Sequence, residues 1–145
     1  MLYVVTGPPT AGKSSWIDAH AKPTDIVIDL DRITIALTGP GAPHWNHGTV
    51  QQRVAQRARY AAIDEATQHL DTVDVYLIHT MPSPKARAKY QRLDARIIVV
   101  DPGESIVMAR IETMRSPAMQ RVAARWYGAR RRGRQAGMPQ ASRAW

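Results

Sequence analysis

The feature that most constrains the fold is a glycine-bounded loop near the start of the chain, running from Gly7 to Ser14 as GPPTAGKS. Residues 2–6, before it, are a short apolar and β-branched run, which predicts a buried strand. Residues 13–21, after it, predict a helix that ends before Pro23. Strand, glycine-rich turn and helix thus follow one another in a single unit, which is typical of an α/β fold.

The rest of the chain continues this alternation. Three further apolar runs predict buried strands, at residues 25–30, 73–78 and 96–100. Because the strands are apolar almost throughout, both faces of the sheet must be covered, which predicts a parallel sheet of four to five strands in a three-layer α/β fold. The segments expected to be helical are 31–37, 49–70, 83–93, 103–114 and the stretch from Ser116 onward.

The longest expected helix, over residues 49–70, carries an apolar residue at every fourth position, and this stripe is expected to face the core. Arg53, Arg57 and Tyr60 share a different face. That face could follow a phosphate backbone, although a solvated helix face is the commoner reason for such a pattern. The apolar stripe consists of Val50, Val54, Ala58, Ala62, Ala66 and Leu70.

The Gly7–Ser14 segment fits G-x-x-x-x-G-K-[ST], the P-loop pattern. In such a loop, backbone N–H groups bind phosphate oxygens, and glycine lets the backbone approach them closely. Lys13 is expected to reach the β- and γ-phosphates, and the Ser14 hydroxyl to bind Mg²⁺. A chance match is the alternative, but the strand before the loop and the helix after it make it the weaker one. The residues expected to bind the nucleotide are Gly7, Pro9, Thr10, Ala11, Gly12, Lys13, Ser14, Ser15 and Arg110.

Other P-loop classes lack their diagnostic residues in this chain. The guanine-reading N-K-x-D of GTPases is absent. A remodelling ATPase is usually larger and has a strand that ends in an acidic pair, whereas the third expected strand here ends in His79 and Thr80. The fourth ends in Asp101, but Pro102 follows it, and a cap for the next helix is the simpler role for that aspartate. The class that remains is the small kinases.

A kinase that phosphorylates a hydroxyl needs a carboxylate near the γ-phosphate, to orient that hydroxyl or accept its proton. Asp29 and Asp31 end the second expected strand, at the edge where open α/β sheets bind ligands. We expect Asp31 to be this base, and Arg32 to neutralise a phosphate of the substrate. The alternatives are a helix N-cap for Asp31 and a solvated position for Arg32.

Phosphoryl transfer also needs positive charge around the transferred group. Arg110 and Arg115 lie near the end of the helix that follows the fourth strand, where a mobile lid is expected around residues 110–125. We expect both arginines to be catalytic together with Lys13. The alternative is that they complement the dipole at the C-terminus of the helix.

In these stretches the chain resembles the kinase module of the bacteriophage 5′-hydroxyl polynucleotide kinases, over most of residues 1–127. The resemblance implies a P-loop kinase fold with a helical lid, ATP and Mg²⁺ as cofactors, a 5′-hydroxyl polynucleotide as the acceptor, and a role for Thr80 in binding substrate. It rests on the P-loop followed by Ser15-Trp16, Asp31 after the second strand, His79-Thr80 before a proline-rich turn and Arg87, and Asp101 before the helix with Arg110.

Two departures from the family leave the acceptor open. The family's third strand usually ends in Asp-Thr, where this chain has His79-Thr80. The family's substrate-phosphate arginine comes three residues after the base, and that position is Thr34 here. Two alternatives therefore stay open: a kinase for a nucleoside, nucleotide or antibiotic, and a nucleotide-binding module without catalysis.

The formal net charge of +8 comes entirely from the C-terminal part of the chain, because acidic and basic residues balance up to Glu112. An arginine-rich segment without acids predicts an anionic partner, for which nucleic acid is the leading candidate. We expect a kinase domain over residues 1–132 and a basic, flexible tail over 133–145. The basic residues after Glu112 are Arg115, Arg121, Arg125, Arg130, Arg131, Arg132, Arg134 and Arg143.

Several other classes are disfavoured by composition. The chain has no cysteine, which excludes disulfides and cysteine nucleophiles. No apolar run approaches the roughly 18 residues that span a bilayer, and the N-terminus lacks a signal-peptide pattern, so we expect no membrane partner and a cytoplasmic location. His44 and His47 lack a nearby third metal ligand, so a structural or substrate contact is favoured for them. Trp45, between them, could stack on a base or cover the core.

Overall fold

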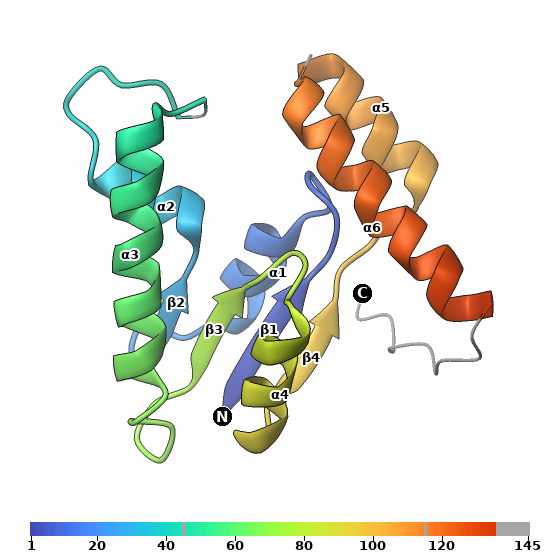
Figure 1. The fold of residues 1–145 in the computed structure, drawn as a ribbon. Helices are drawn as coiled ribbons and strands as arrows, with labels where there is room; N and C mark the ends of the chain where they lie inside the picture. The colour runs from blue at the N-terminus through green and yellow to red at the C-terminus, as the bar shows by residue number, and fades with distance from the viewer. Residues whose placement is uncertain (45, 115, 136–145) are drawn as a thin grey trace.

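A computed structural model describes residues 1–44, 46–114 and 116–135 of the chain. Four strands form one parallel sheet in the order β2-β3-β1-β4 (Figure 1). The expected α/β class with a parallel sheet is therefore confirmed, with four strands in the described residues. The strands are β1 (Leu2–Thr6), β2 (Ile26–Ile28), β3 (Val75–Ile78) and β4 (Arg96–Val99).

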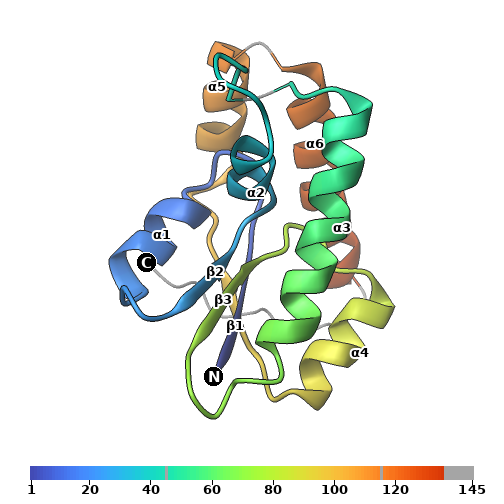
Figure 2. The same ribbon diagram turned by 90° about the vertical axis from the view of Figure 1, so that its left-hand side faces the viewer.

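Helices cover both faces of this sheet. Figure 2 shows α1 on one side of the sheet and both α3 and α4 on the other, an arrangement compatible with the expected three layers. The two C-terminal helices, α5 and α6, lie side by side near the end of β4 (Figure 1). The helices of the described residues are α1 (Lys13–His20), α2 (Leu30–Ala36), α3 (Thr49–Ala66), α4 (Pro84–Arg92), α5 (Glu104–Met114) and α6 (Pro117–Gln135).

The layers are held by side chains that alternate between the two faces of each strand. On one face, Val4 of β1 packs in a buried cluster with Ile63 of α3 and Tyr90 of α4. On the other face, Val5 packs in a cluster with Ile17 of α1. Full burial of an aliphatic side chain of this size contributes about 1.5–3 kcal/mol, so the two clusters fix α1, α3 and α4 against the sheet.

A third buried cluster joins α5 and α6 to β4, and a buried carboxylate anchors it. The Tyr127 hydroxyl of α6 donates to Oδ1 of Asp101 at 2.8 Å, and the Gly103 N–H donates to the same oxygen at 3.0 Å. Burial and this hydrogen bond raise the pKa of Tyr127. Asp101 therefore closes the turn before α5 and holds α6 beside it, a structural role as favoured above. The cluster consists of Val99, Val107, Ile111, Ala123, Trp126 and Tyr127.

The stripe predicted for the long helix is wrong in its first half. Val50 is 72% exposed and Val54 is 51% exposed. The buried residues of α3 are instead Ala55, Arg59, Ile63 and Ala66. A strict four-residue spacing drifts about 40° per step around a helix of 3.6 residues per turn, so the face that packs near Ala66 is not the face that carries Val50. An apolar pattern also cannot reveal a buried face that carries a cation.

The C-terminal helix continues further than expected. Because α6 extends to Gln135, residues 133–135 of the expected tail are helical, while 136–145 lie outside the described residues, as do Trp45 and Arg115. Within the parts of the chain that the structure describes, no helix combines the length and the apolar character needed to cross a bilayer.

Tyr127→Phe should lower the free energy of unfolding by about 1–3 kcal/mol, because it removes the hydroxyl donor of a buried carboxylate while keeping the packed ring. Urea denaturation measures this. Tyr60→Phe is the control, since Tyr60 is 52% exposed and its loss of a hydroxyl should cost little. An equal loss in both variants would contradict the anchoring role of Asp101.

Candidate functional site

The crossovers of the sheet open a crevice between two neighbouring strands. From β1 the chain crosses through α1 to β2, and from β3 it crosses through α4 to β4, in opposite directions over the sheet. Where neighbouring parallel strands send their connections opposite ways, a ligand crevice forms outside their carboxyl ends. The Gly7–Ser14 loop follows β1 and lies on one side of this crevice, and residues 79–81 follow β3 and lie on the other.

The loop adopts a backbone that only glycine permits at Gly7. The residue has a φ of 150°, and a Cβ there would lie 2.1 Å from the carbonyl oxygen of Val100. Gly12 (φ 95°) and Thr10 (φ 62°) also have positive φ, and the buried Oγ1 of Thr10 has no hydrogen-bond partner in the described part of the chain. Such strain and an unpaired buried hydroxyl are features that cluster at ligand sites.

Lys13 folds back over this loop. Its Nζ donates to the carbonyl of Gly7 at 2.9 Å and to that of Pro8 at 2.6 Å. Burial lowers the pKa of Lys13 to about 8, opposed by the carboxylates of Asp31 and Asp29, so the side chain remains a cation at neutral pH. Neutral carbonyls are weaker partners for an ammonium than an anion is, which leaves Lys13 suited to bind phosphate.

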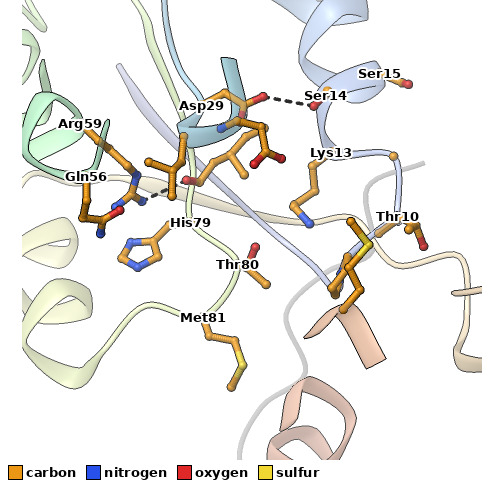
Figure 3. A pocket seen from close by; sticks show the side chains of 17 residues that line it. Thr10, Lys13, Ser14, Ser15, Asp29, Gln56, Arg59, His79, Thr80 and Met81 are labelled. Carbon is orange, nitrogen blue, oxygen red and sulfur yellow. Dashed lines mark hydrogen bonds between the residues drawn. The ribbon is translucent and has the colours of Figure 1, made fainter. Parts of the chain in front are cut away.

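Asp29, rather than Asp31, is the N-cap of α2. Its Oδ1 accepts the backbone N–H of Asp31 at 3.0 Å, and its Oδ2 accepts the hydroxyl of Ser14 at 3.4 Å (Figure 3). This removes the capping alternative for Asp31. It also places a buried carboxylate beside the hydroxyl that was expected to bind Mg²⁺, and hard cations prefer such oxygen ligands. No role of its own was expected for Asp29 from the sequence.

Asp31 faces the same space as Lys13. Asp31 as a whole is exposed, yet burial of its carboxyl group by the surrounding protein atoms raises the pKa of that group. The charge of Asp29 also raises this pKa, whereas Lys13 and His47 lower it. A carboxylate with a raised pKa is a better proton acceptor near neutral pH.

These residues surround a cavity of about 600 Å³, the size of a small-molecule site, which we call the loop cavity. It brings together the predicted residues Lys13, Ser14, Asp31 and Thr80. Gly7 and Arg32 are not among the residues that line it, and the side chain of Arg32 is exposed. The lining residues are Pro9–Ser15, Asp29, Leu30, Asp31, Gln56, Arg59, Ile78, His79, Thr80, Met81 and Met119.

Arg110 reaches the loop from α5. Its Nη1 donates to the carbonyl of Thr10 at 2.7 Å, which joins the segment expected to act as a lid to the loop expected to bind phosphate. Met119 of α6 lines the loop cavity from the same segment. Arg115, the other arginine expected to be catalytic there, lies outside the described residues.

A second cavity, also of about 600 Å³, adjoins the first along α3, and we call it the α3 cavity. Arg53 and Arg57 line it, although both residues are exposed. His44 and His47 line it from the preceding loop, and Asp31 is the sole acid among the described residues around it. The two cavities share Leu30, Asp31, Gln56 and Met119.

Arg59 is a candidate that the sequence analysis missed. The residue is 5% exposed and lines the loop cavity, where its Nη2 donates to the carbonyl of Ile78 at 3.1 Å. Its Nε is buried without a partner, and no carboxylate of the described residues forms an ion pair with it. Arg59 is four residues from both Ala55 and Ile63, and this spacing was the available sequence signal that the three share one helix face. The signal was missed because that face is not uniformly apolar.

His79 lies beside Arg59 and is neutral at physiological pH. Its Nδ1 is 2.8 Å from the hydroxyl of Tyr90, which fixes the ring. Burial, and to a lesser degree the charge of Arg59, lowers the pKa of His79 to about 4.

In the described residues no group of three or more His, Asp or Glu side chains is arranged to hold a metal ion. The chain matches no protein-family model and no curated protein.

His79→Gln should reduce the loss of stability on acidification. The unfolded chain binds a proton at His79 near pH 6.5, whereas the folded chain does so only near pH 4, so the free energy of unfolding falls as pH drops between these values. Urea denaturation at both ends of this range measures the change. His69→Gln, at an exposed position, is the control, and an unaltered slope in His79→Gln would contradict the burial of a neutral imidazole.

Proposed function

We propose that this chain is an ATP-dependent P-loop kinase that transfers the γ-phosphate to a hydroxyl, and that this hydroxyl is the 5′-hydroxyl of a polynucleotide. The observation that carries the proposal is that Lys13, Ser14 and Asp31 line one cavity. Phosphoryl transfer requires a cation for the phosphates, an oxygen ligand for Mg²⁺ and a carboxylate for the attacking hydroxyl, and these three residues supply them.

The loop residues fit a nucleotide triphosphate. The backbone N–H groups before and at the start of α1 would hold the phosphates. The unpaired hydroxyl of Thr10 and the ammonium of Lys13 add two further donors. Ser14 and Asp29 would hold Mg²⁺, which when bound neutralises charge on the phosphate oxygens.

The acceptor side of the site rests on Asp31. Its carboxylate, with a raised pKa, would orient the acceptor hydroxyl and take its proton. Thr80 would offer a hydroxyl to the acceptor from across the cavity. Arg110, already in contact with the loop, would add positive charge from the lid side, as Lys13 does from within the loop.

A polynucleotide is favoured over a small neutral acceptor by the charge of the α3 cavity. Arg53 and Arg57 line this cavity, and Asp31 lies where it meets the loop cavity. A strand bound along α3 would contact the arginines through its phosphates and present its end to Asp31. The exposed arginines of α6 add further positive charge, and they include Arg121, Arg125, Arg132 and Arg134.

An acceptor panel with labelled ATP tests the proposal. An oligonucleotide with a 5′-hydroxyl should be labelled, and the same oligonucleotide with a 5′-phosphate should not. Labelling of a nucleoside or an antibiotic alone would overturn the polynucleotide acceptor, and ATP binding without transfer to any acceptor would overturn the kinase itself.

Asp31→Asn should lower kcat by about 10²–10⁴-fold and leave the affinity for ATP nearly unchanged, because an amide cannot accept the proton of the hydroxyl. Steady-state kinetics and nucleotide titration measure the two quantities. Asp18→Asn, on the exposed side of α1, is the matched control. An Asp31→Asn variant with full kcat would remove Asp31 as the base.

Replacing Arg53 and Arg57 together with alanine should weaken oligonucleotide binding and reduce the slope of log K against log salt by about 1.4, since each phosphate contact with a single strand contributes about 0.7. Fluorescence anisotropy over a range of salt concentrations measures the slope. The double alanine variant of Arg87 and Arg92 on α4 matches the charge change away from both cavities. The same slope in both double variants would contradict binding along α3.

A further inference from the structure

The exposed face of α6, at the edge of the molecule beside α5 (Figure 1), carries a row of arginines. Arg121, Arg125 and Arg132 are exposed, and at about 100° per residue they lie within about 40° of one another around the helix. The helix rises about 1.5 Å per residue, so these three residues, which we call the arginine row, cover about 16 Å along its axis. Nη1 of Arg132 lies over Gly128, on the same side of the helix, 3.4 Å from the position that an added Cβ would take.

The arginine row faces away from the two cavities. Ala123, in the buried cluster under α6, is about 160–180° around the helix from each arginine of the row. Met119, which lines both cavities, is about 120–160° from them. Among the described residues, no arginine of α6 lines either cavity. A ligand on the row would therefore occupy a site separate from the cavities.

The charges of the row are not compensated within the described residues. Two other arginines of α6 have partners: Arg131 forms an ion pair with Glu104 at 3.1 Å, and Arg130 lies 5.6 Å from the ring centre of Trp126. The row forms no ion pair with any described residue, and α6 contains no acidic side chain. Like charges one turn apart on a helix destabilise it, so an anionic partner along this face would be stabilising.

The other residues of α6 distinguish between the possible anionic partners. Single-strand sites combine basic residues with aromatic rings on which bases stack, but Trp126 and Tyr127, the aromatic residues of α6, are buried. Helices that bind a membrane surface insert an apolar face, but the apolar face of α6 is packed in the cluster with α5 and β4. A double helix needs neither feature, because it presents a phosphate charge for every 1.7 Å or so of its axis.

We propose that the arginine row binds the phosphate backbone of double-helical nucleic acid, at a site separate from the loop cavity and the α3 cavity. The guanidinium fork matches the oxygens of a phosphate. Contacts with phosphates carry no direct sequence information, so the binding is independent of base sequence. The site requires neither ATP nor phosphoryl transfer.

A duplex that offers no 5′-hydroxyl tests the site. The probe is a blunt DNA duplex of about 20 base pairs, roughly two helical turns, with phosphate at both 5′ ends, and no ATP is added. Replacing the three row arginines with glutamine should reduce the slope of log K against log salt by about 2.7, since each duplex phosphate contact contributes about 0.9. Fluorescence anisotropy over a range of salt concentrations measures the slope.

Control variants separate the row from general charge, from the fold and from the cavities. The triple glutamine variant of Arg87, Arg92 and Arg96, exposed on α4 and β4, makes the same charge change and should keep the slope. The triple lysine variant of the row keeps its charges and should also keep the slope. Because the row is exposed and glutamine is a good helix former, its glutamine variant should melt at nearly the original temperature. The double alanine variant of Arg53 and Arg57 should leave duplex binding unchanged.

Each other outcome overturns part of the proposal. Equal slopes in the two triple glutamine variants would overturn the site. An equal loss in the Arg53 and Arg57 variant would overturn its separation from the cavities. A larger loss for the single strand than for the duplex would overturn the double helix as the partner, as would row-dependent binding to phosphatidylserine vesicles with an unaltered duplex slope. Row-dependent duplex binding without transfer to any acceptor would overturn the kinase and leave this site standing.

Discussion

The close packing of Gly7 against the carbonyl of Val100 is the constraint on which the site depends. No Cβ fits between them, so the loop after β1 is pressed against the chain after β4 before it turns into α1. This places Lys13 and Ser14 opposite Asp31 of α2 and Thr80 of the loop after β3. The buried clusters on both faces of the sheet then hold the segments that carry these residues in place relative to one another.

The charges of the site are arranged around that geometry. Lys13 and Arg59 stand at two ends of one cavity, and Asp29 and Asp31 come from the start of α2. Each cation is bonded to backbone carbonyls rather than to a carboxylate at ion-pair distance. Carbonyl dipoles hold a cation in place without neutralising it, so the cavity keeps two positive ends that anionic ligands can occupy. The neutral His79 preserves this balance on the α3 side.

How much was predictable from the sequence depended on whether the signal was local. The loop, the strands before and after it, and the parallel α/β class follow from spacing and apolar runs, and the structure bears them out. The buried face of α3 did not follow from the apolar pattern, because its buried side includes Arg59 and its exposed side includes Val50. The N-cap of α2 is Asp29 rather than Asp31, since β2 ends earlier than its apolar run suggested and α2 begins at Leu30.

The sequence by itself determined the loop conformation and the residues at its ends, because a turn with positive φ and a helix start depend on neighbours within a few positions. Only the tertiary structure decided which arginines serve the cavities. Arg53, Arg57 and Arg59 look alike along α3, yet Arg59 is buried at the end of β3 while the other two line the adjoining cavity. The difference is set by the sheet edge against which α3 packs, because contacts between residues distant in the chain decide which face of the helix is buried.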